Sequence, residues 1–215
     1  MRAPSTLFFT LLPLLFSSYF ASAESLEDYA KRTQGHFYQG YYEKGVKTGW
    51  FYVHRYIGKY QTKRMAISDG TRTIYEKVQG KWIVRTLAYR RYYALSGNGE
   101  LQRAEFMYKN PEGKSTWIAV PQADGLHISY SGPGHPRNRI VGLPKESLRS
   151  VQQLEQWLAD AKPGAEAKAP ECRISDQEVN SEVTYRLLGW ERSASAAKPE
   201  KIAVLTMATS RGPYK

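Results

Sequence analysis

Short reversals between strand-like runs are the feature that most constrains the fold of this chain. The runs are rich in aromatic and β-branched residues, and pairs such as Asp69-Gly70, Gln79-Gly80 and Asn98-Gly99 separate them. A parallel neighbour would need a crossover of roughly a dozen residues or more, which these reversals are too short to supply. Consecutive strands are therefore predicted to pair antiparallel, as a meander.

Two of the reversals have specific turn chemistry. The segment His36–Tyr60 predicts a hairpin of two aromatic strands that reverses at Glu43–Val46, where Gly45 can adopt a positive φ. The pair Asn98-Gly99 predicts a two-residue type I′ turn, because both central residues of that turn need φ > 0, which asparagine and glycine tolerate. Each turn would join two long neighbouring strands.

The spacing of apolar residues predicts a sheet in which neither face is cleanly polar. Aromatic and aliphatic residues occur at both alternating parities of Trp82–Tyr93, and the same holds for Trp50–Ile57. We therefore expect a mainly β (α+β) fold, built as a curved antiparallel meander sheet or half-barrel of about 9 to 11 strands. Its concave side is expected to be apolar, and its convex side to carry tyrosine and arginine.

Two helices are expected to accompany the sheet. Residues 24–35 predict a short N-terminal helix that is capped by Ser25. Residues 145–162 predict one long helix, because apolar residues recur every three or four positions and Ser150 can start a capping box. This longer helix is expected to lie as a lid across the mouth or concave face of the sheet.

One β-rich domain is expected to contain the rest of the chain. It would span residues 36–215 and include the lid helix. An Ala/Lys/Pro-rich linker is expected at residues 165–171, followed by further strands.

The first 23 residues are predicted to be a secretory signal peptide. Arg2 supplies the basic start, Leu7–Phe16 the apolar stretch, and Ala21-Ser22-Ala23 a cleavage site before Glu24. An uncleaved membrane anchor is the weaker interpretation, because the apolar stretch is shorter than the ~20 residues that a spanning helix needs. The protein is expected to be periplasmic or extracellular, with no transmembrane segment after cleavage.

The charge of the chain bears on its partners. Lysine and arginine number 31 against 20 acidic residues, which gives a net charge of +11. Such a charge favours a lipid headgroup or an anionic envelope polymer. The positive residues are scattered along the chain, so a solvated basic surface without a dedicated partner is an equal alternative. Nucleic acid is not an expected partner.

The sequence contains little that indicates catalysis. Cys172 is the only cysteine, so no intramolecular disulfide can form. It would act as a nucleophile only if the fold brought a histidine near it, and none of the 4 histidines lies in a nucleophile motif. Metal-ligand spacings and phosphate-binding loops are not found, so no catalytic residue, metal or cofactor is predicted.

An aromatic and basic surface is the best candidate for binding. Arginines alternate with tyrosines on the strands around Asn98-Gly99, a pattern typical of surfaces for anionic lipids, glycans or single-stranded nucleic acid. The alternative is cross-strand packing with ion pairs to Glu100 and Glu105, and Trp157 of the lid helix can be simple core packing. The candidate ligand-binding residues are Trp50, Tyr52, Tyr56, Arg85, Tyr89, Arg91, Tyr93 and Trp157.

The order of these elements resembles a known domain. The run Gly40–Trp50, the meander after it, and Leu143–Leu148 leading into Leu154–Leu158 resemble the β-rich domain that precedes transglutaminase-like domains in some exported bacterial proteins, notably of planctomycetes. That resemblance covers roughly Gly40 to Trp190 and implies a curved half-barrel with a helical lid. It is similar in outline to lipoprotein carriers, whose concave side accepts acyl chains. The residues after Trp190 have no place for a transglutaminase Cys-His-Asp set, so only architecture is implied.

These observations lead to one functional hypothesis and two alternatives. The hypothesis is an exported non-enzymatic binding module that engages a lipid or anionic cell-envelope component through a concave apolar face and a basic rim. The first alternative is a structural or protein-interaction domain accessory to an envelope complex. The second is a hydrolase or transferase that uses Cys172.

Overall fold

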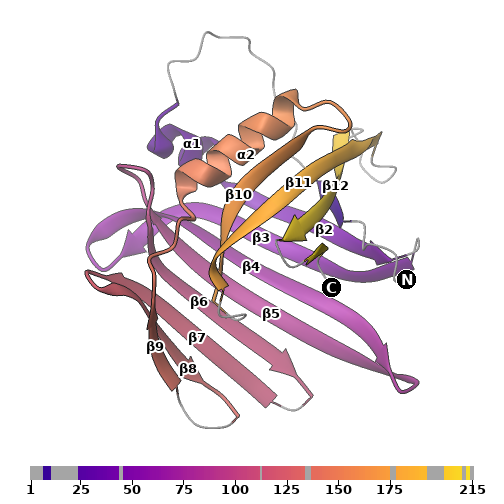
Figure 1. Cartoon of the computed structure of the whole chain (residues 1–215), viewed down its shortest axis with the longest axis horizontal. Helices are drawn as coiled ribbons and strands as arrows, with labels where there is room; N and C mark the ends of the chain where they lie inside the picture. The colour runs from indigo at the N-terminus through magenta and orange to yellow at the C-terminus, as the bar shows by residue number, and fades with distance from the viewer. Residues whose placement is uncertain are drawn as a thin grey trace.

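The computed structural model describes residues 7–10, 24–43, 46–111, 113–133, 137–174, 178–192, 201–209 and 212–213. Within them, one large antiparallel sheet carries two helices at one end (Figure 1). The helices are α1 (Leu26–Arg32) and α2 (Leu148–Asp160). The strands are β1 (Leu7–Thr10), β2 (Gly35–Glu43), β3 (Val46–Tyr60), β4 (Lys63–Val78), β5 (Lys81–Ala94), β6 (Leu101–Asn110), β7 (Gly113–Gln122), β8 (Gly125–Ser131), β9 (Arg137–Val141), β10 (Glu166–Arg173), β11 (Glu178–Arg192), β12 (Lys201–Thr209) and β13 (Gly212–Pro213).

The expected antiparallel meander is confirmed. Strands β2 to β9 follow one another in space as they do in sequence, and β10 to β12 form a second run that β1 joins to β2. The described sheet has 13 strands, more than expected, because the short β1 and β13 and the unexpected β10 take part. Its two ends, β9 and β10, are not paired in the described residues, so the sheet is not closed into a barrel.

Strand β1 lies within the segment predicted to be the signal peptide. It pairs with β12 from Leu7↔Leu205 to Thr10↔Ile202, and with β2 at Leu7↔Tyr41. The remainder of the predicted leader, including its apolar stretch beyond Thr10 and its cleavage site, lies outside the described residues.

The sheet curls so that its second run crosses the first. Figure 1 shows β10 to β12 lying in front of the long β3 to β7 strands, with α2 across the top. At the far end of β10, Arg139 of β9 donates a hydrogen bond from Nη2 to the carbonyl of Ile174, at 3.0 Å. Cys172 and Ile174 are fully buried there, within the same core cluster as Leu126 and Ile128 of β8. The concave face is therefore largely filled by side chains of the crossing elements.

Strand parity assigns each core cluster to a face. The row Arg91, Ala104, Ala119 and Ile128 runs in register across β5 to β8 and faces inward, against the main core. The opposite parity carries a smaller cluster of Met65, Ile67 and Tyr92, packed with Tyr56 and Tyr60. A third cluster joins Leu158 of α2 to β11 and β12. The two-sided apolar pattern in the sequence thus reflects cores on both faces of the sheet.

The predicted reversal at Asp69-Gly70 is wrong, because β4 runs straight through it. A Cβ at Gly70 would lie 2.2 Å from Cε1 of the Tyr89 ring, so this strand position requires glycine for close packing. The glycine therefore marks a cross-strand contact with an aromatic ring, which a strand glycine can also indicate.

The predicted type I′ turn at Asn98-Gly99 is also wrong. Gly97 and Gly99 take positive φ values of 63° and 71° in a longer reversal, while Asn98 is not among the residues with positive φ. Among the described residues, the turn with two successive positive φ values is Gln79-Gly80, at 48° and 80°. The longer reversal has a structural role, because the carbonyls of Asn98 and Gly99 accept hydrogen bonds from the first turn of α2.

Both helices form where they were expected, with shifted boundaries. Ser25 caps α1 by accepting a hydrogen bond from the backbone N–H of Asp28. Helix α2 begins at Leu148, later than the predicted residue 145, because Ser147 is its N-cap; the capping box is formed by Ser147 and Ser150, three residues before the predicted start of the box at Ser150. The expected linker at 165–171 is mostly strand β10. No helix in the described ranges has the length and apolarity to cross a membrane.

Candidate functional site

A cavity of about 110 Å³ lies between the concave face of the sheet and the two helices. Its apolar wall comes from Ala30 of α1, Ala66 of β4, and Leu148 and Val151 of α2. Its polar wall consists of side chains that α1, β3 and β5 supply. They are Tyr29, Arg55, Tyr89, Arg91 and Tyr93.

The cavity is small for a lipid. An apolar cavity of about 150 Å³ in another protein holds one benzene molecule, so 110 Å³ has no room for a whole acyl chain. With α1 and α2 in this position, the concave face offers a partly polar pocket beneath a closed lid.

A buried carboxylate binds two residues of the polar wall, Arg91 and Tyr93. Glu146, only 3% exposed, accepts hydrogen bonds from Arg91 Nη1 at 3.0 Å, from the Tyr93 hydroxyl, and from the backbone N–H of Cys172 at 2.7 Å. Arg91 also donates from Nη2 to the carbonyl of Cys172, at 3.3 Å. This network joins the segment before α2 to β5 and to β10. It therefore holds the lid helix over the pocket.

The same network shifts the ionisation of its members. Burial acts to lower the pKa of Arg91, but the adjacent Glu146 carboxylate raises that pKa well above its ordinary value. Burial and then Glu146 raise the pKa of Tyr93 well above its ordinary value. The arginine stays charged and the tyrosine stays protonated, so both remain donors to the carboxylate.

A second ion pair closes the pocket toward α2. Arg55 of β3 donates from Nη1 to Glu155 Oε1 at 2.6 Å, and both side chains keep partial contact with solvent. Burial opposes the charge of Arg55, while Glu155 raises the pKa of Arg55 above its ordinary value. Each of the two arginines that line the pocket is thus paired with a carboxylate, Arg91 with Glu146 and Arg55 with Glu155.

Two hydrogen-bond donors in the pocket wall have no partner among the described residues. They are the hydroxyl of Tyr29, whose residue is 1% exposed, and Nε of Arg91. Burial and then the charge of Glu155 raise the pKa of Tyr29, so its hydroxyl keeps its proton. A buried donor without an acceptor costs about 1 to 3 kcal/mol. A bound oxygen acceptor would remove that cost.

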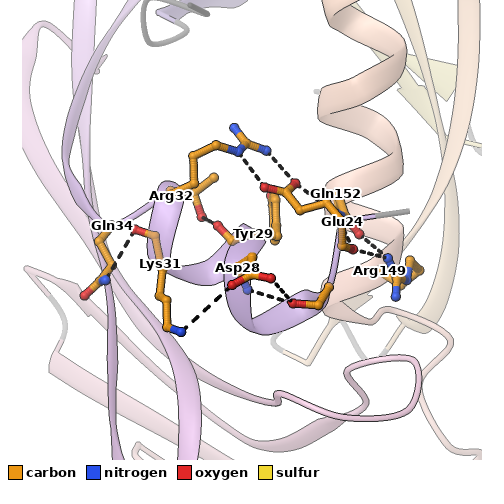
Figure 2. Close-up of polar contacts among 10 residues, drawn as sticks. Glu24, Asp28, Tyr29, Lys31, Arg32, Gln34, Arg149 and Gln152 are labelled. Carbon is orange, nitrogen blue, oxygen red and sulfur yellow. Dashed lines mark hydrogen bonds and ion pairs between the residues drawn. The ribbon is translucent and has the colours of Figure 1, made fainter. Parts of the chain in front are cut away.

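A clamp around Glu24 joins the two helices (Figure 2). The Glu24 carboxylate accepts from Arg32 Nε at 2.8 Å and Nη2 at 2.9 Å, and from Gln152 Nε2 at 3.2 Å. The backbone carbonyl of Glu24 accepts from Arg149 Nη1 at 3.2 Å. Because Gln152 is 1% exposed and Arg149 belongs to α2, the clamp fixes α1 against α2 largely through polar contacts.

Acid is expected to weaken this clamp. The hydrogen bond from Arg32 lowers the pKa of Glu24 below its ordinary value of 4.5. The folded state therefore favours the carboxylate, and its stabilisation is complete above about pH 4.5 and lost as the pH falls through the lower folded pKa. Because Glu24 is partly exposed, we expect its ionised form to contribute about 0.5 to 1 kcal/mol to the free energy of unfolding. The measurement compares thermal unfolding of the native chain and Glu24→Gln between about pH 7 and about pH 3. Their difference should shrink toward acid, and a constant difference would contradict the clamp.

The predicted ligand-binding residues do not form one site. Tyr89, Arg91 and Tyr93 lie together in the pocket wall, where Tyr56 also reaches its edge. Tyr52 belongs to a stack of aromatic rings on the convex face, with His36 and Tyr38. The other three lie elsewhere: Arg85 pairs with Glu76 at 3.2 Å, Trp50 lines an open hollow with Tyr38, and Trp157 packs against the β11–β12 core.

Sequence reasoning missed the residues that close the pocket. Tyr29, Arg55, Glu146 and Glu155 were not among the predicted residues. Tyr29 and Arg55 line the pocket, and the two carboxylates bind its two arginines. Glu146 had one available signal, because it is the only acidic residue between Asp124 and Glu155. An isolated carboxylate in a basic stretch is a candidate for a buried pair.

Cys172 does not have the surroundings of a nucleophile. Its side chain is fully buried, and burial raises the pKa of its thiol to about 12. A thiolate is the reactive form, so the thiol is expected to be inert at neutral pH. Titration with Ellman's reagent should detect no reactive thiol in the native chain and one after denaturation. Rapid reaction of the native protein would contradict this burial.

Metal binding has no support in the described ranges, where no group of three or more potential ligands comes together. Comparisons with protein-family models, curated proteins and solved structures found no match to the chain. The resemblance to the domain ahead of transglutaminase-like domains therefore stays a prediction.

Proposed function

We propose that this protein is an exported, non-enzymatic binding module that takes up part of a lipid or another amphiphilic envelope component beneath α1 and α2. The observation that carries the proposal is the pocket itself. It combines an apolar wall with two unpartnered buried donors, the Tyr29 hydroxyl and Arg91 Nε. An amphiphile with an acceptor oxygen next to an apolar chain satisfies both features.

The size of the pocket requires the lid to move when such a ligand binds. At about 110 Å³ the closed pocket accepts only the end of a chain or a small head. Apart from the buried Glu146 network just before α2, the polar contacts that keep α1 and α2 in place are the Glu24 clamp and the Arg55–Glu155 pair, and both of these are partly exposed to solvent. Exposed polar pairs contribute about 0 to 1 kcal/mol each, so displacing them is a modest cost for a ligand that buries apolar surface.

Native mass spectrometry of the purified protein tests the proposal. The native chain is expected to carry a bound amphiphile that organic extraction releases. Ala66→Leu fills the pocket and should abolish the adduct, whereas Ala88→Leu, on the opposite parity of β5, should retain it. An adduct that is equal in both variants, or absent from the native chain, would count against a ligand in this pocket. In that case a stoichiometric protein partner would support the structural alternative.

The export component of the proposal has its own test. Expressed with its leader in a bacterial host, the mature chain is expected to begin at Glu24, which intact-mass measurement reads directly. Cleavage there would remove β1 from between β12 and β2 and leave Glu24 at the chain terminus, inside the α1–α2 clamp. An intact leader on the protein in the periplasm or medium would contradict this processing.

A further inference from the structure

The tip of the β4–β5 hairpin extends beyond the sheet. Within the described residues, pairing of β4 with β3 ends at Ile74, and pairing of β5 with β6 begins only at Thr86. The hairpin continues to Val78↔Lys81 with no strand on either side (Figure 1). Four further residues of β4 correspond to about 13 Å of projection at roughly 3.3 Å per residue. The tip, residues 75–85, therefore stands free of the sheet.

The hairpin tip carries exposed apolar side chains that serve no core. Trp82 is 66% exposed, and Tyr75, Val78 and Val84 are exposed as well. Pairing in register places Tyr75 opposite Val84, and Lys77 opposite Trp82, on one face of the ribbon. An isolated two-stranded hairpin is marginal in water, so apolar residues that face solvent there call for another explanation.

Basic side chains surround this apolar group. Residues 72–85 contain four basic residues and one acid, Glu76, which pairs with Arg85 at 3.2 Å. Among the described residues, no carboxylate lies within ion-pair distance of Lys77 or Lys81. Tryptophan and tyrosine favour the headgroup layer of a bilayer, and lysine near them adds attraction to anionic lipids.

We infer that the hairpin tip docks the protein on an anionic lipid bilayer. Its projection of about 13 Å is sufficient to reach the headgroup layer, into which interfacial elements sink about 5 to 10 Å. The outer edges of the ribbon carry unpaired backbone N–H and C=O groups, which need water or headgroups as partners. The tip therefore rests at the interface and does not enter the hydrocarbon core.

This surface is independent of the pocket. Helix α1 contacts the opposite end of β4, where Glu27 pairs with Arg64 at 3.1 Å. The tip begins eleven residues further along the same strand, at Tyr75. Docking through the tip would leave α1 and α2 facing away from the membrane contact, free to move.

Vesicle co-sedimentation of the full chain tests the inference. The native protein should bind vesicles of phosphatidylglycerol mixed with phosphatidylcholine, and should bind pure phosphatidylcholine far more weakly. Lys77→Gln with Lys81→Gln, and separately Trp82→Ala, should each weaken binding by about tenfold or more. Matched controls are Ile140→Thr on β9 and Lys162→Gln after α2, both exposed elsewhere, and these should bind as the native chain does.

Three results would overturn the inference. The first is that the native chain does not bind anionic vesicles. The second is that the tip variants and the control variants lose vesicle binding equally. The third is that the tip variants bind vesicles as tightly as the native chain does. Sedimentation velocity tests the alternative that the hairpin tip binds a second copy of this chain. A concentration-dependent dimer that Trp82→Ala dissociates, without vesicle binding, would assign the apolar tip to self-association. Thermal unfolding of each variant confirms that the substituted chains remain folded.

Discussion

Replacing Glu146 by glutamine is expected to lower the free energy of unfolding by about 3 to 5 kcal/mol. The carboxylate is 3% exposed and accepts from Arg91, from the Tyr93 hydroxyl and from the Cys172 N–H. Glutamine leaves the Arg91 charge buried without a counter-ion, and it turns an amide donor toward groups that also donate. Urea denaturation followed by circular dichroism measures the change.

A matched substitution and a compensating pair sharpen this test. Glu155→Gln breaks the more exposed pair with Arg55 and should cost about 1 kcal/mol. Arg91→Met combined with Glu146→Leu removes both buried charges and should recover much of the loss. If Glu146→Gln were no more destabilising than Glu155→Gln, the buried carboxylate would not be what holds the lid segment.

Gly99→Ala is expected to destabilise the protein by about 2 to 4 kcal/mol. Gly99 has φ +71°, and an added Cβ would lie 2.6 Å from Leu148 Cβ and 2.9 Å from Leu26 Cδ1. Those two residues begin α2 and α1, so the methyl group would push both helices from the sheet. Urea denaturation measures the effect.

Gly97→Ala is the control for that substitution. Its φ of +63° imposes a similar backbone cost, but an added Cβ meets only the flexible carboxylate of Glu100, at 3.2 Å. We expect a loss of about 1 kcal/mol, because the strain is present without the clash. Equal losses at the two positions would show that the contact with the helices does not matter.

The order of the strands in the sheet could be predicted from the short spacing between them, but the positions and conformations of several turns could not. Short reversals dictated antiparallel pairing, and the described sheet confirms it. The same glycine signal misled at Gly70, because packing against the Tyr89 ring also requires glycine. The Ala/Lys/Pro composition of residues 165–171 suggested a linker, yet β10 is an edge strand, where proline is tolerated.

Only part of the pocket could be predicted from the sequence. Alternating parity along β5 places Tyr89, Arg91 and Tyr93 on one face, so their grouping followed from a local pattern. Their partners come from distant elements: Glu146 lies 55 residues from Arg91. Such pairings depend on how the segment before α2 and the helix itself pack over the sheet. The local spacing of residues in the sequence does not indicate that packing.

The most direct test of the proposed pocket is a fluorescence titration with cis-parinaric acid, an anionic chain that becomes emissive when buried. The native chain and Ala88→Leu should show saturable binding at one site, displaced by lipid extracted from the envelope. Ala66→Leu, which fills the cavity beneath α1 and α2, should weaken that binding by about tenfold or more. Equal affinity in all three proteins, or no saturable binding in any, would contradict a ligand site under the helices.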